Sequence, residues 1–256
     1  MKLAFWQGRL PESVGAALDE MEATVSDADA DVVVFPELFL GGYLLEDAGA
    51  RVSTPADLAR AQDIAARNAT CVVFGYFERS GSLYNSALAI NAEGAVVAKY
   101  RKTHLFGAAE RAAFSPGDRL GDIFDIKGVK AALLICYDLE FCEAPRALAL
   151  RGAKILIVPT ANMKPYDVVN DVVVPVRALE NHAFVCYCNW AEFVSAEGVH
   201  FNGRSSICGP DGHVLEKFDD ISCGVKTTDV HIQDIDETED DYLQDRRPEL
   251  YADLLR

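Results

Sequence analysis

The chain has 256 residues, half of them hydrophobic and a quarter charged, so it is long enough and apolar enough to bury a sizeable core. With 24 Lys and Arg against 40 Asp and Glu, its formal net charge is -16, which disfavours nucleic acid as a partner because phosphate would be repelled. No apolar run approaches the ~20 residues of a membrane-spanning helix, and seven scattered cysteines suit the reduced thiols of a cytoplasmic protein.

Apolar runs of strand length alternate with Ala-rich amphipathic stretches along the chain. We expect strands, in chain order, at residues 3–6, 32–35, 71–77, 87–90, 129–135, 155–158 and 183–188. We expect helices between them at residues 12–26, 55–68, 143–151 and 167–181. Pro175 predicts a kink or boundary in the last of these, because proline cannot continue a helix.

The strand pattern favours a mixed sheet in an α/β protein. Residues 82–100 are typical of an antiparallel hairpin around a turn at residues 91–94, whereas the continuous apolar run at 155–158 indicates burial on both faces. We expect a single domain over residues 1–256, with a peripheral tail from about residue 230 onward.

The first candidate functional residue is Glu37, which follows the expected strand at residues 32–35 among apolar and aromatic neighbours. Partial burial would raise the pKa of its carboxyl and make it a proton shuttle near neutral pH. A glutamate after a strand is more often a helix cap or a surface charge, so this feature alone does not establish catalysis.

Lys102 lies in a basic cluster, residues 99–104, at the end of a predicted strand in a protein short of positive charge. A lysine ammonium is a compact charge that can stabilise a developing oxyanion. For the neighbouring Arg101 we favour a solvated residue that protects a sheet edge.

Cys136 has the strongest setting, at the end of a buried strand and just before a turn into a predicted helix. There, backbone amides and the helix dipole can favour a thiolate and an adjacent oxyanion. Buried cysteine is also a common inert core residue, so position alone leaves both interpretations open. Cys186 and Cys188 alternate along a strand and make a poor metal site without further Cys or His, so we expect no metal.

Three blocks, in this order, resemble the signature blocks of the nitrilase (carbon-nitrogen hydrolase) superfamily: Pro36-Glu37-Leu38, Arg-Lys-Thr-His-Leu-Phe at residues 101–106, and Cys136-Tyr137-Asp138. The likeness continues through short segments at residues 41–43, 84–86, 114–117, 151–153, 159–162, 177–181 and 209–212. An ordered series that covers nearly the whole chain is far more specific than any one of its members.

The resemblance implies an α/β fold that is a four-layer α-β-β-α sandwich, with two mixed sheets face to face and helices outside. It implies that Cys136 is the nucleophile, Glu37 the general base and acid, and Lys102 the stabiliser of the tetrahedral intermediate. The backbone N–H of Tyr137 would complete the oxyanion hole, and Glu110 would orient the lysine or the hydrolytic water. No cofactor is implied, and a homodimer or higher homo-oligomer is expected.

Two positions after the nucleophile bear on the substrate. Tyr137-Asp138 looks like the amidase branches, whereas true nitrilases usually carry Trp-Glu there, so we expect cleavage of a small carboxamide to a carboxylic acid and ammonia. Glu140 stands where relatives that hydrolyse ω-amides carry arginine, which favours neutral or amine-bearing amides such as amino acid amides. Tyr43 and Asn162 are the other expected substrate-binding residues. A structural ion pair is the alternative role for Glu140.

Other hypotheses stay open at this point. The chain could be an ω-amidase or N-carbamoyl amidohydrolase of the same family, or a catalytically silent binding protein of the same fold. A Cys-His hydrolase that uses His104 is the nearest rival enzyme class, although nothing around Cys136 resembles the motifs of those families. Replacement of His104 would abolish turnover on that hypothesis alone.

Overall fold

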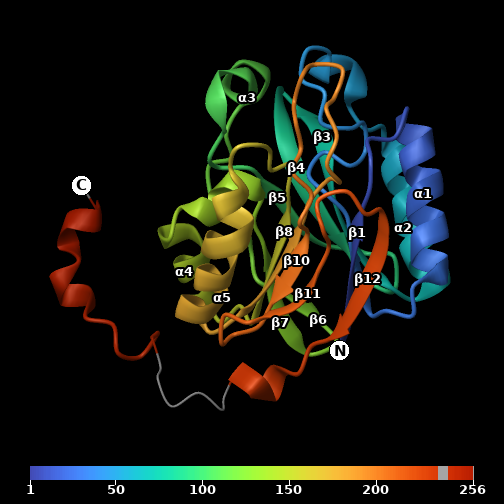
Figure 1. Ribbon diagram of the computed structural model, residues 1–256. Coiled ribbons are helices and arrows are strands. Elements are labelled where there is room, and N and C mark those ends of the chain that lie inside the picture. The colour runs from blue at the N-terminus through green and yellow to red at the C-terminus, as the bar shows by residue number, and fades with distance from the viewer. Residues whose placement is uncertain (236–241, 256) are drawn as a thin grey trace.

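Two six-stranded sheets form the centre of the computed structural model, which describes residues 1–235 and 242–255 (Figure 1). The first sheet has the spatial order β12 (Gly224–Asp229), β1 (Lys2–Gln7), β2 (Val32–Val34), β3 (Cys71–Ser80), β4 (Ser82–Ile90) and β5 (Val96–Arg101). Its inner strands β1, β2 and β3 run parallel, and the other neighbouring pairs are antiparallel.

The second sheet repeats this plan. Its spatial order is β11 (Val214–Lys217), β10 (Ser206–Cys208), β9 (Phe184–Cys188), β8 (Ile155–Pro159), β7 (Val129–Leu133) and β6 (Phe124–Ile126). Here β7, β8 and β9 are parallel, and the flanking pairs are antiparallel. Both sheets are therefore mixed, as the sequence predicts.

Helices cover the outer face of each sheet, which confirms the predicted four-layer sandwich (Figure 1). The first sheet carries α1 (Val14–Asp27) and α2 (Pro55–Asn68), and the second carries α4 (Glu143–Leu150) and α5 (Val174–Asn181). A fifth helix, α3 (Gly107–Ala113), stands at one end of the sandwich. Short helices complete the list: η1 (Ala48–Arg51), η2 (Cys136–Glu140), the π-helix η3 (Val169–Val173), η4 (Ile232–Ile235), η5 (Pro248–Leu250) and η6 (Ala252–Leu255).

Local chemistry explains where the predicted helices begin and end. Thr54 and Asp57 form a capping box at the start of α2, and Pro55 occupies the first turn, where its missing N–H costs nothing. The stretch predicted as one helix at residues 167–181 is divided between η3 and α5, and Pro175 lies in the first turn of α5. The predicted boundary at Pro175 is confirmed.

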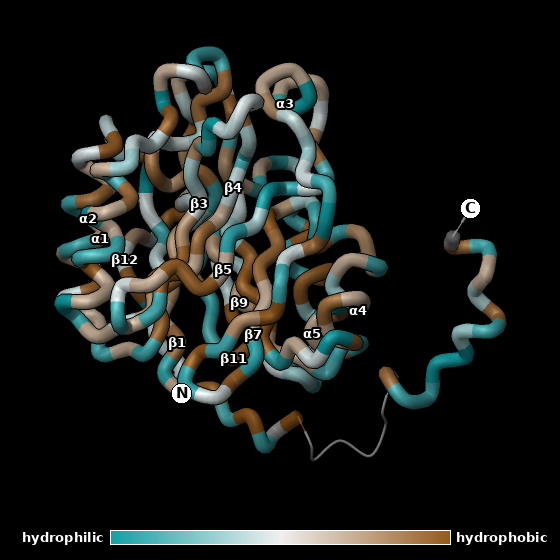
Figure 2. The backbone as a smooth tube through the Cα atoms, turned by 180° about the vertical axis from the view of Figure 1, so that it is seen from behind, coloured by the Kyte–Doolittle hydropathy of each residue, from teal (hydrophilic) through white to brown (hydrophobic). Residues whose placement is uncertain are grey.

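Two apolar clusters hold the layers together. One lies between the sheets and under α4 and α5, and includes Phe5, Val34 and Ile157. The other packs the first sheet against α1 and α2, and includes Met21 and Ile64. In Figure 2 the hydrophobic colour follows the central strands, whereas α1 and α2 alternate between hydrophobic and hydrophilic residues.

The C-terminal residues differ in burial along their length. Val230 and Ile235 are 1% and 4% exposed and pack on the core, whereas Leu250 and Leu254 are each 65% exposed. The expected tail from about residue 230 falls partly on residues 236–241 and 256, which lie outside the described residues. No helix in the described part of the chain is long and apolar enough to cross a bilayer.

Candidate active site

Glu37 follows β2 of the first sheet, and its backbone is fixed from several sides. Its N–H donates to Thr160 O of the second sheet at 3.3 Å, and Trp190 Nε1 donates to Glu37 O at 3.2 Å. Leu38 has a φ of 52°. A Cβ on Gly75 would lie only 2.2 Å from Leu38 N and 2.7 Å from Glu37 Cα, so only glycine lets β3 approach this turn.

Lys102 follows β5 and places its ammonium between two buried carboxylates. Its Nζ lies 2.7 Å from Oε1 of Glu37 and 2.7 Å from Oε1 of Glu110. The three side chains are each at most 1% exposed. Asn85 Nδ2 also donates to Glu37 Oε1 at 2.6 Å. In the described part of the chain, the other oxygen of this carboxylate, Oε2, has no hydrogen-bond partner, which leaves it available to a reacting group.

Glu110 is held on α3 so that it faces Lys102. Tyr43 OH donates to Glu110 Oε1 at 2.7 Å, and the Phe106 N–H donates to Glu110 Oε2 at 2.7 Å. Both carboxylate oxygens therefore accept hydrogen bonds, which fixes the side chain that orients Lys102. The sequence names Glu110 and Lys102 as site residues, and the structure brings them together.

The proton affinities of this cluster follow from burial and charge. Burial raises the pKa of Glu37 to about 7, and the carboxylate of Glu110 adds to the rise while Lys102 opposes it. Burial alone would lower the pKa of Lys102, but the carboxylates of Glu110 and Glu37 outweigh it and hold this pKa well above its usual value. At neutral pH Lys102 is a cation, and Glu37 can take up or release a proton.

Cys136 belongs to the second sheet, at the turn where β7 leads into η2. Its φ of 45° lies in the left-handed region, which costs a residue with a side chain about 1 to 3 kcal/mol and is maintained only by its surroundings. The buried carboxylate of Asp138 secures this turn. Asp138 Oδ2 accepts from Ile135 N–H at 3.1 Å and from Tyr100 OH at 2.9 Å, and Oδ1 accepts from His104 N–H at 2.9 Å.

The thiol of Cys136 is neutral in this environment. Burial raises its pKa well above the usual value, Glu37 adds to the rise, and Lys102 and the Ala161 backbone N–H lower it less than these raise it. The expectation that the helix start would favour a resting thiolate is therefore wrong, because burial beside a carboxylate outweighs a helix dipole from a single short turn. A thiol in this state needs a base to take its proton before it can act as a nucleophile.

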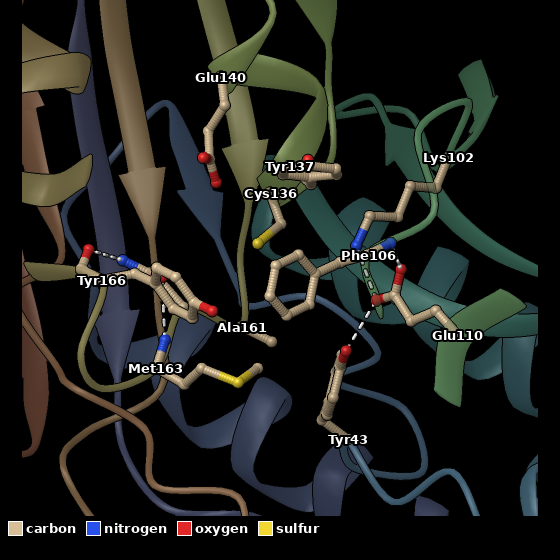
Figure 3. A pocket seen from close by; sticks show the side chains of 11 residues that line it. Tyr43, Lys102, Phe106, Glu110, Cys136, Tyr137, Glu140, Ala161, Met163 and Tyr166 are labelled. Carbon is tan, nitrogen blue, oxygen red and sulfur yellow. Dashed lines mark hydrogen bonds and ion pairs between the residues drawn. The ribbon is translucent and has the colours of Figure 1, made fainter. Parts of the chain in front are cut away.

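The pocket in front of Cys136 is lined by side chains from both halves of the molecule (Figure 3). Beyond the residues already described, the walls are formed by Phe106, Tyr137, Ala161, Met163 and Tyr166. The Phe106 ring packs against those of Tyr137 and Tyr166, with centroids 5.2 and 5.6 Å apart. Sequence reasoning missed Phe106, Met163 and Tyr166 as lining residues, because only the fold brings these segments together.

Glu140 also lines the pocket, and its carboxylate points toward the cavity (Figure 3). Burial raises the pKa of this half-buried carboxyl, while the charges of Lys102 and Arg177 lower it less. Arg177 donates to the backbone oxygens of Leu139 and Glu140 and pairs with Glu180. Within the described residues no ion pair reaches the Glu140 carboxylate, so the structural role that the sequence left open is not the one observed.

The other two expected substrate-binding residues take part in internal contacts. Tyr43 lines the pocket with its hydroxyl given to Glu110. Asn162 lines it as well, but its Nδ2 donates to Tyr166 O at 3.1 Å and Asn170 Oδ1 at 2.6 Å, and its Oδ1 accepts from Met163 N–H. Asn162 therefore shapes the wall of the pocket.

His104 is placed away from the nucleophile. Its ring stacks on Phe141 with centroids 4.1 Å apart, its Nδ1 lies 2.7 Å from Asp138 Oδ1, and it does not line the pocket. Arg101 stacks on Tyr84 and pairs with Glu78, so it has a structural partner in the first sheet. The geometry gives the Cys-His hypothesis no support.

Comparison with known proteins identifies the family of the chain. Residues 4–240 match the profile of the Carbon-nitrogen hydrolase family. The chain is 41% identical to a protein described as "Hydrolase in pqqF 5'region" from Pseudomonas protegens, over 99% of this chain and 92% of that one. It is 37% identical to an (R)-stereoselective amidase of a Pseudomonas species, over 86% and 80% of the two chains.

A solved structure provides the same comparison in three dimensions. The amidase from Nesterenkonia sp. superposes with a TM-score of 0.90 at 32% identity, over 99% of this chain and 96% of that chain. Another structure of that amidase is described with the acetamide moiety of fluoroacetamide added covalently at its active site cysteine. On its sequence, its fold and these relatives, the chain belongs to the carbon-nitrogen hydrolase family, in the amidase-type branch of the nitrilase superfamily.

Proposed function

We propose that this amidase cleaves a small carboxamide to a carboxylic acid and ammonia through a thioester on Cys136. The observation that carries the proposal is the buried cluster beside the thiol, in which Lys102 links Glu37 and Glu110 and leaves one oxygen of Glu37 without a partner. A buried carboxyl with a pKa of about 7 next to a neutral thiol has the proton affinity that a base for that thiol requires.

In the first step Cys136 Sγ attacks the amide carbon while the Glu37 carboxylate takes the thiol proton. The carbonyl oxygen gains a negative charge, which Lys102 Nζ and the Tyr137 N–H stabilise. The Tyr137 N–H lies in the first turn of η2, where backbone N–H groups have no partner within the helix. Loss of one such donor typically costs about 10²- to 10³-fold in rate.

In the second step the protonated Glu37 returns its proton to the amide nitrogen, the C–N bond breaks and ammonia leaves. Water then attacks the thioester as Glu37 accepts a proton from it, and the acid departs as Cys136 regains its proton. Atoms balance, because amide and water become acid and ammonia. Glu110 keeps Lys102 directed at the oxyanion through both halves of the reaction.

The pocket charges support neutral or amine-bearing amides, such as amino acid amides, as substrates. The Glu140 carboxylate points into the cavity without an ion pair in the described structure, so it would repel an anionic acyl group and attract an amine. This disfavours the ω-amidase alternative. We expect Glu140→Gln to lower kcat/KM for an amino acid amide relative to a dicarboxylic acid monoamide. Unchanged relative preference would show that Glu140 does not recognise the substrate.

Ammonia release from a panel of carboxamides, N-carbamoyl compounds and nitriles tests the function. Cys136→Ala and Glu37→Gln should each remove nearly all turnover, and mass spectrometry of the active protein should detect an acyl adduct. Cys142→Ala is the matched control, because that thiol is exposed and does not line the pocket. Undiminished turnover in Cys136→Ala would reject the mechanism, and absence of both adduct and turnover in the unaltered protein would favour a silent binding protein.

A further inference from the structure

Next to the pocket in front of Cys136 lies a much larger apolar cavity, which we call the vestibule. We propose that the vestibule binds the hydrocarbon part of the acyl group, so that the preferred substrates are primary amides with an aromatic or longer aliphatic acyl chain. The inference rests on the amidase function proposed above and names the substrate class of that site.

The two cavities are adjacent and very unequal. Both are lined by Tyr43, Phe106 and Met163, which therefore lie at the boundary between them. The space open to the centres of water molecules is about 10 Å³ in the inner pocket, room for about one water, and about 660 Å³ in the vestibule. The inner pocket has no room for an acyl chain, so the chain of a bound amide must lie in the vestibule, whose volume is typical of small-molecule sites.

Helix α3 contributes to both cavities from opposite faces. Glu110 is 1% exposed and points inward to Lys102, while Ala109 and Ala112 are exposed and line the vestibule. A methyl group is the smallest apolar side chain, so these alanines give an apolar wall and leave the cavity open. Leu45, Leu83 and Val199 line the vestibule as well.

The charges of the vestibule exclude anionic acyl groups. Glu46 and Glu197 are the charged residues among those that line it in the described structure. Glu197 accepts hydrogen bonds from the N–H groups of Leu45 and Glu46, at 2.8 and 3.0 Å, and so joins two loops at the cavity wall. A substrate carboxylate in the vestibule would be repelled by Glu46 and Glu197, and no cation among the described lining residues would offset that repulsion. A hydrocarbon chain would instead be stabilised there, because its apolar surface is removed from water.

The size of the effect follows from the area removed from water. Burial of one methylene contributes about 0.8 kcal/mol, and tenfold in rate corresponds to about 1.4 kcal/mol, so kcat/KM should rise about fourfold per added methylene. The rise continues only while the added carbon enters the vestibule. It should be absent when the vestibule is filled by a protein side chain.

The test measures kcat/KM by ammonia release for acetamide, butyramide, hexanamide, 3-phenylpropanamide and glutaric acid monoamide. We expect a rise of about 50-fold or more from acetamide to hexanamide, and a fall for the anionic monoamide relative to hexanamide. Ala112→Phe should lower the ratio of kcat/KM for hexanamide to that for acetamide and so remove most of the gain. Ala59→Phe, at an exposed alanine of α2 that does not line the vestibule, should leave the whole series unchanged.

The outcomes separate this inference from the function beneath it. Equal kcat/KM for acetamide and hexanamide, or a preference for the anionic monoamide, would overturn the proposal that the vestibule binds the acyl chain, and the amidase function would still stand. Absence of turnover with every amide would reject both. Val199→Phe fills the cavity from another segment, so retention of the hexanamide gain in both filled variants would also overturn the inference.

Discussion

Replacement of Glu110 by glutamine should shift the pH dependence of catalysis toward acid. Glu37 must be deprotonated to accept the thiol proton, so kcat/KM of the unaltered enzyme should fall as the pH drops through the pKa of about 7. The Glu110 carboxylate raises that pKa. Removal of the Glu110 charge ends the repulsion between the carboxylates of Glu110 and Glu37. It also leaves Glu37 as the one carboxylate paired with Lys102 in the cluster, and both changes lower the pKa of Glu37.

The magnitude follows from the geometry. Each Oε1 lies 2.7 Å from Lys102 Nζ, so the two carboxylate oxygens are at most about 5.4 Å apart. At an effective dielectric constant of 20, two unit charges at that distance repel by about 3 kcal/mol. Since one pH unit corresponds to 1.36 kcal/mol, the acidic limb should move down by about two pH units.

The assay is kcat/KM for one neutral amide between about pH 5 and 9, which reports the free enzyme. Glu110→Gln should also lower the plateau by about 10²-fold, because Lys102 loses the partner that orients it. The pH at which the acidic limb lies does not depend on the height of the plateau. The limb therefore reports the charge effect of Glu110 on Glu37, and the plateau reports its effect on the orientation of Lys102. Glu93→Gln, at an exposed turn, is the control and should leave the profile unchanged. A limb in Glu110→Gln that stays in place or moves to higher pH would refute the reasoning.

Three further predictions follow from other contacts. Asn85→Ala should move the acidic limb to higher pH and cut kcat/KM about tenfold, because the hydrogen bond from Asn85 lowers the pKa of Glu37 and its loss lets that pKa rise; a shift to lower pH would contradict this. Gly75→Ala should lower the free energy of unfolding by about 1 to 3 kcal/mol in denaturant titrations, because its Cβ would overlap Leu38 N, whereas Gly15→Ala in α1 should not destabilise. We propose a homodimer or higher homo-oligomer, since α4 and α5 carry exposed apolar side chains, and light scattering of a monomer at micromolar concentration would count against it.

The sequence predicts the sheets well and names candidate site residues that the fold brings together, for a physical reason. Strands such as β8 are buried on both faces and appear as continuous apolar runs, and Glu37, Lys102 and Cys136 lie in short blocks at strand ends, where the surrounding residues identify them. Helix α2 has its capping box and proline in consecutive positions, so its start is predicted correctly. Information carried by neighbours in sequence is sufficient for these features.

Features that depend on distant segments were beyond sequence reasoning. The protonation of Cys136 depends on burial and on Glu37, which is 99 positions away, so the local helix start gave the wrong expectation. The vestibule combines segments around Leu45, Ala112 and Val199, and none of them has a pattern that indicates a cavity. Asn85 was part of a recognised block, but only the structure gives it a partner in Glu37.

The proposed base and the proposed nucleophile are carried by different sheets. Glu37 extends from the end of β2 and Cys136 from the end of β7. The two sheets are held face to face mainly by apolar side-chain packing, with a few hydrogen bonds such as that from Glu37 N–H to Thr160 O. The packing between the sheets therefore sets the position of Glu37 relative to Cys136. A shift of about 1 Å between the sheets would cost about 10²-fold in rate without unfolding either sheet. Substitutions that remove a single methyl group from this interface, such as Ile157→Val, should lower kcat more than they lower the melting temperature. Turnover is therefore a more sensitive measure of the relative position of the two sheets than thermal stability is.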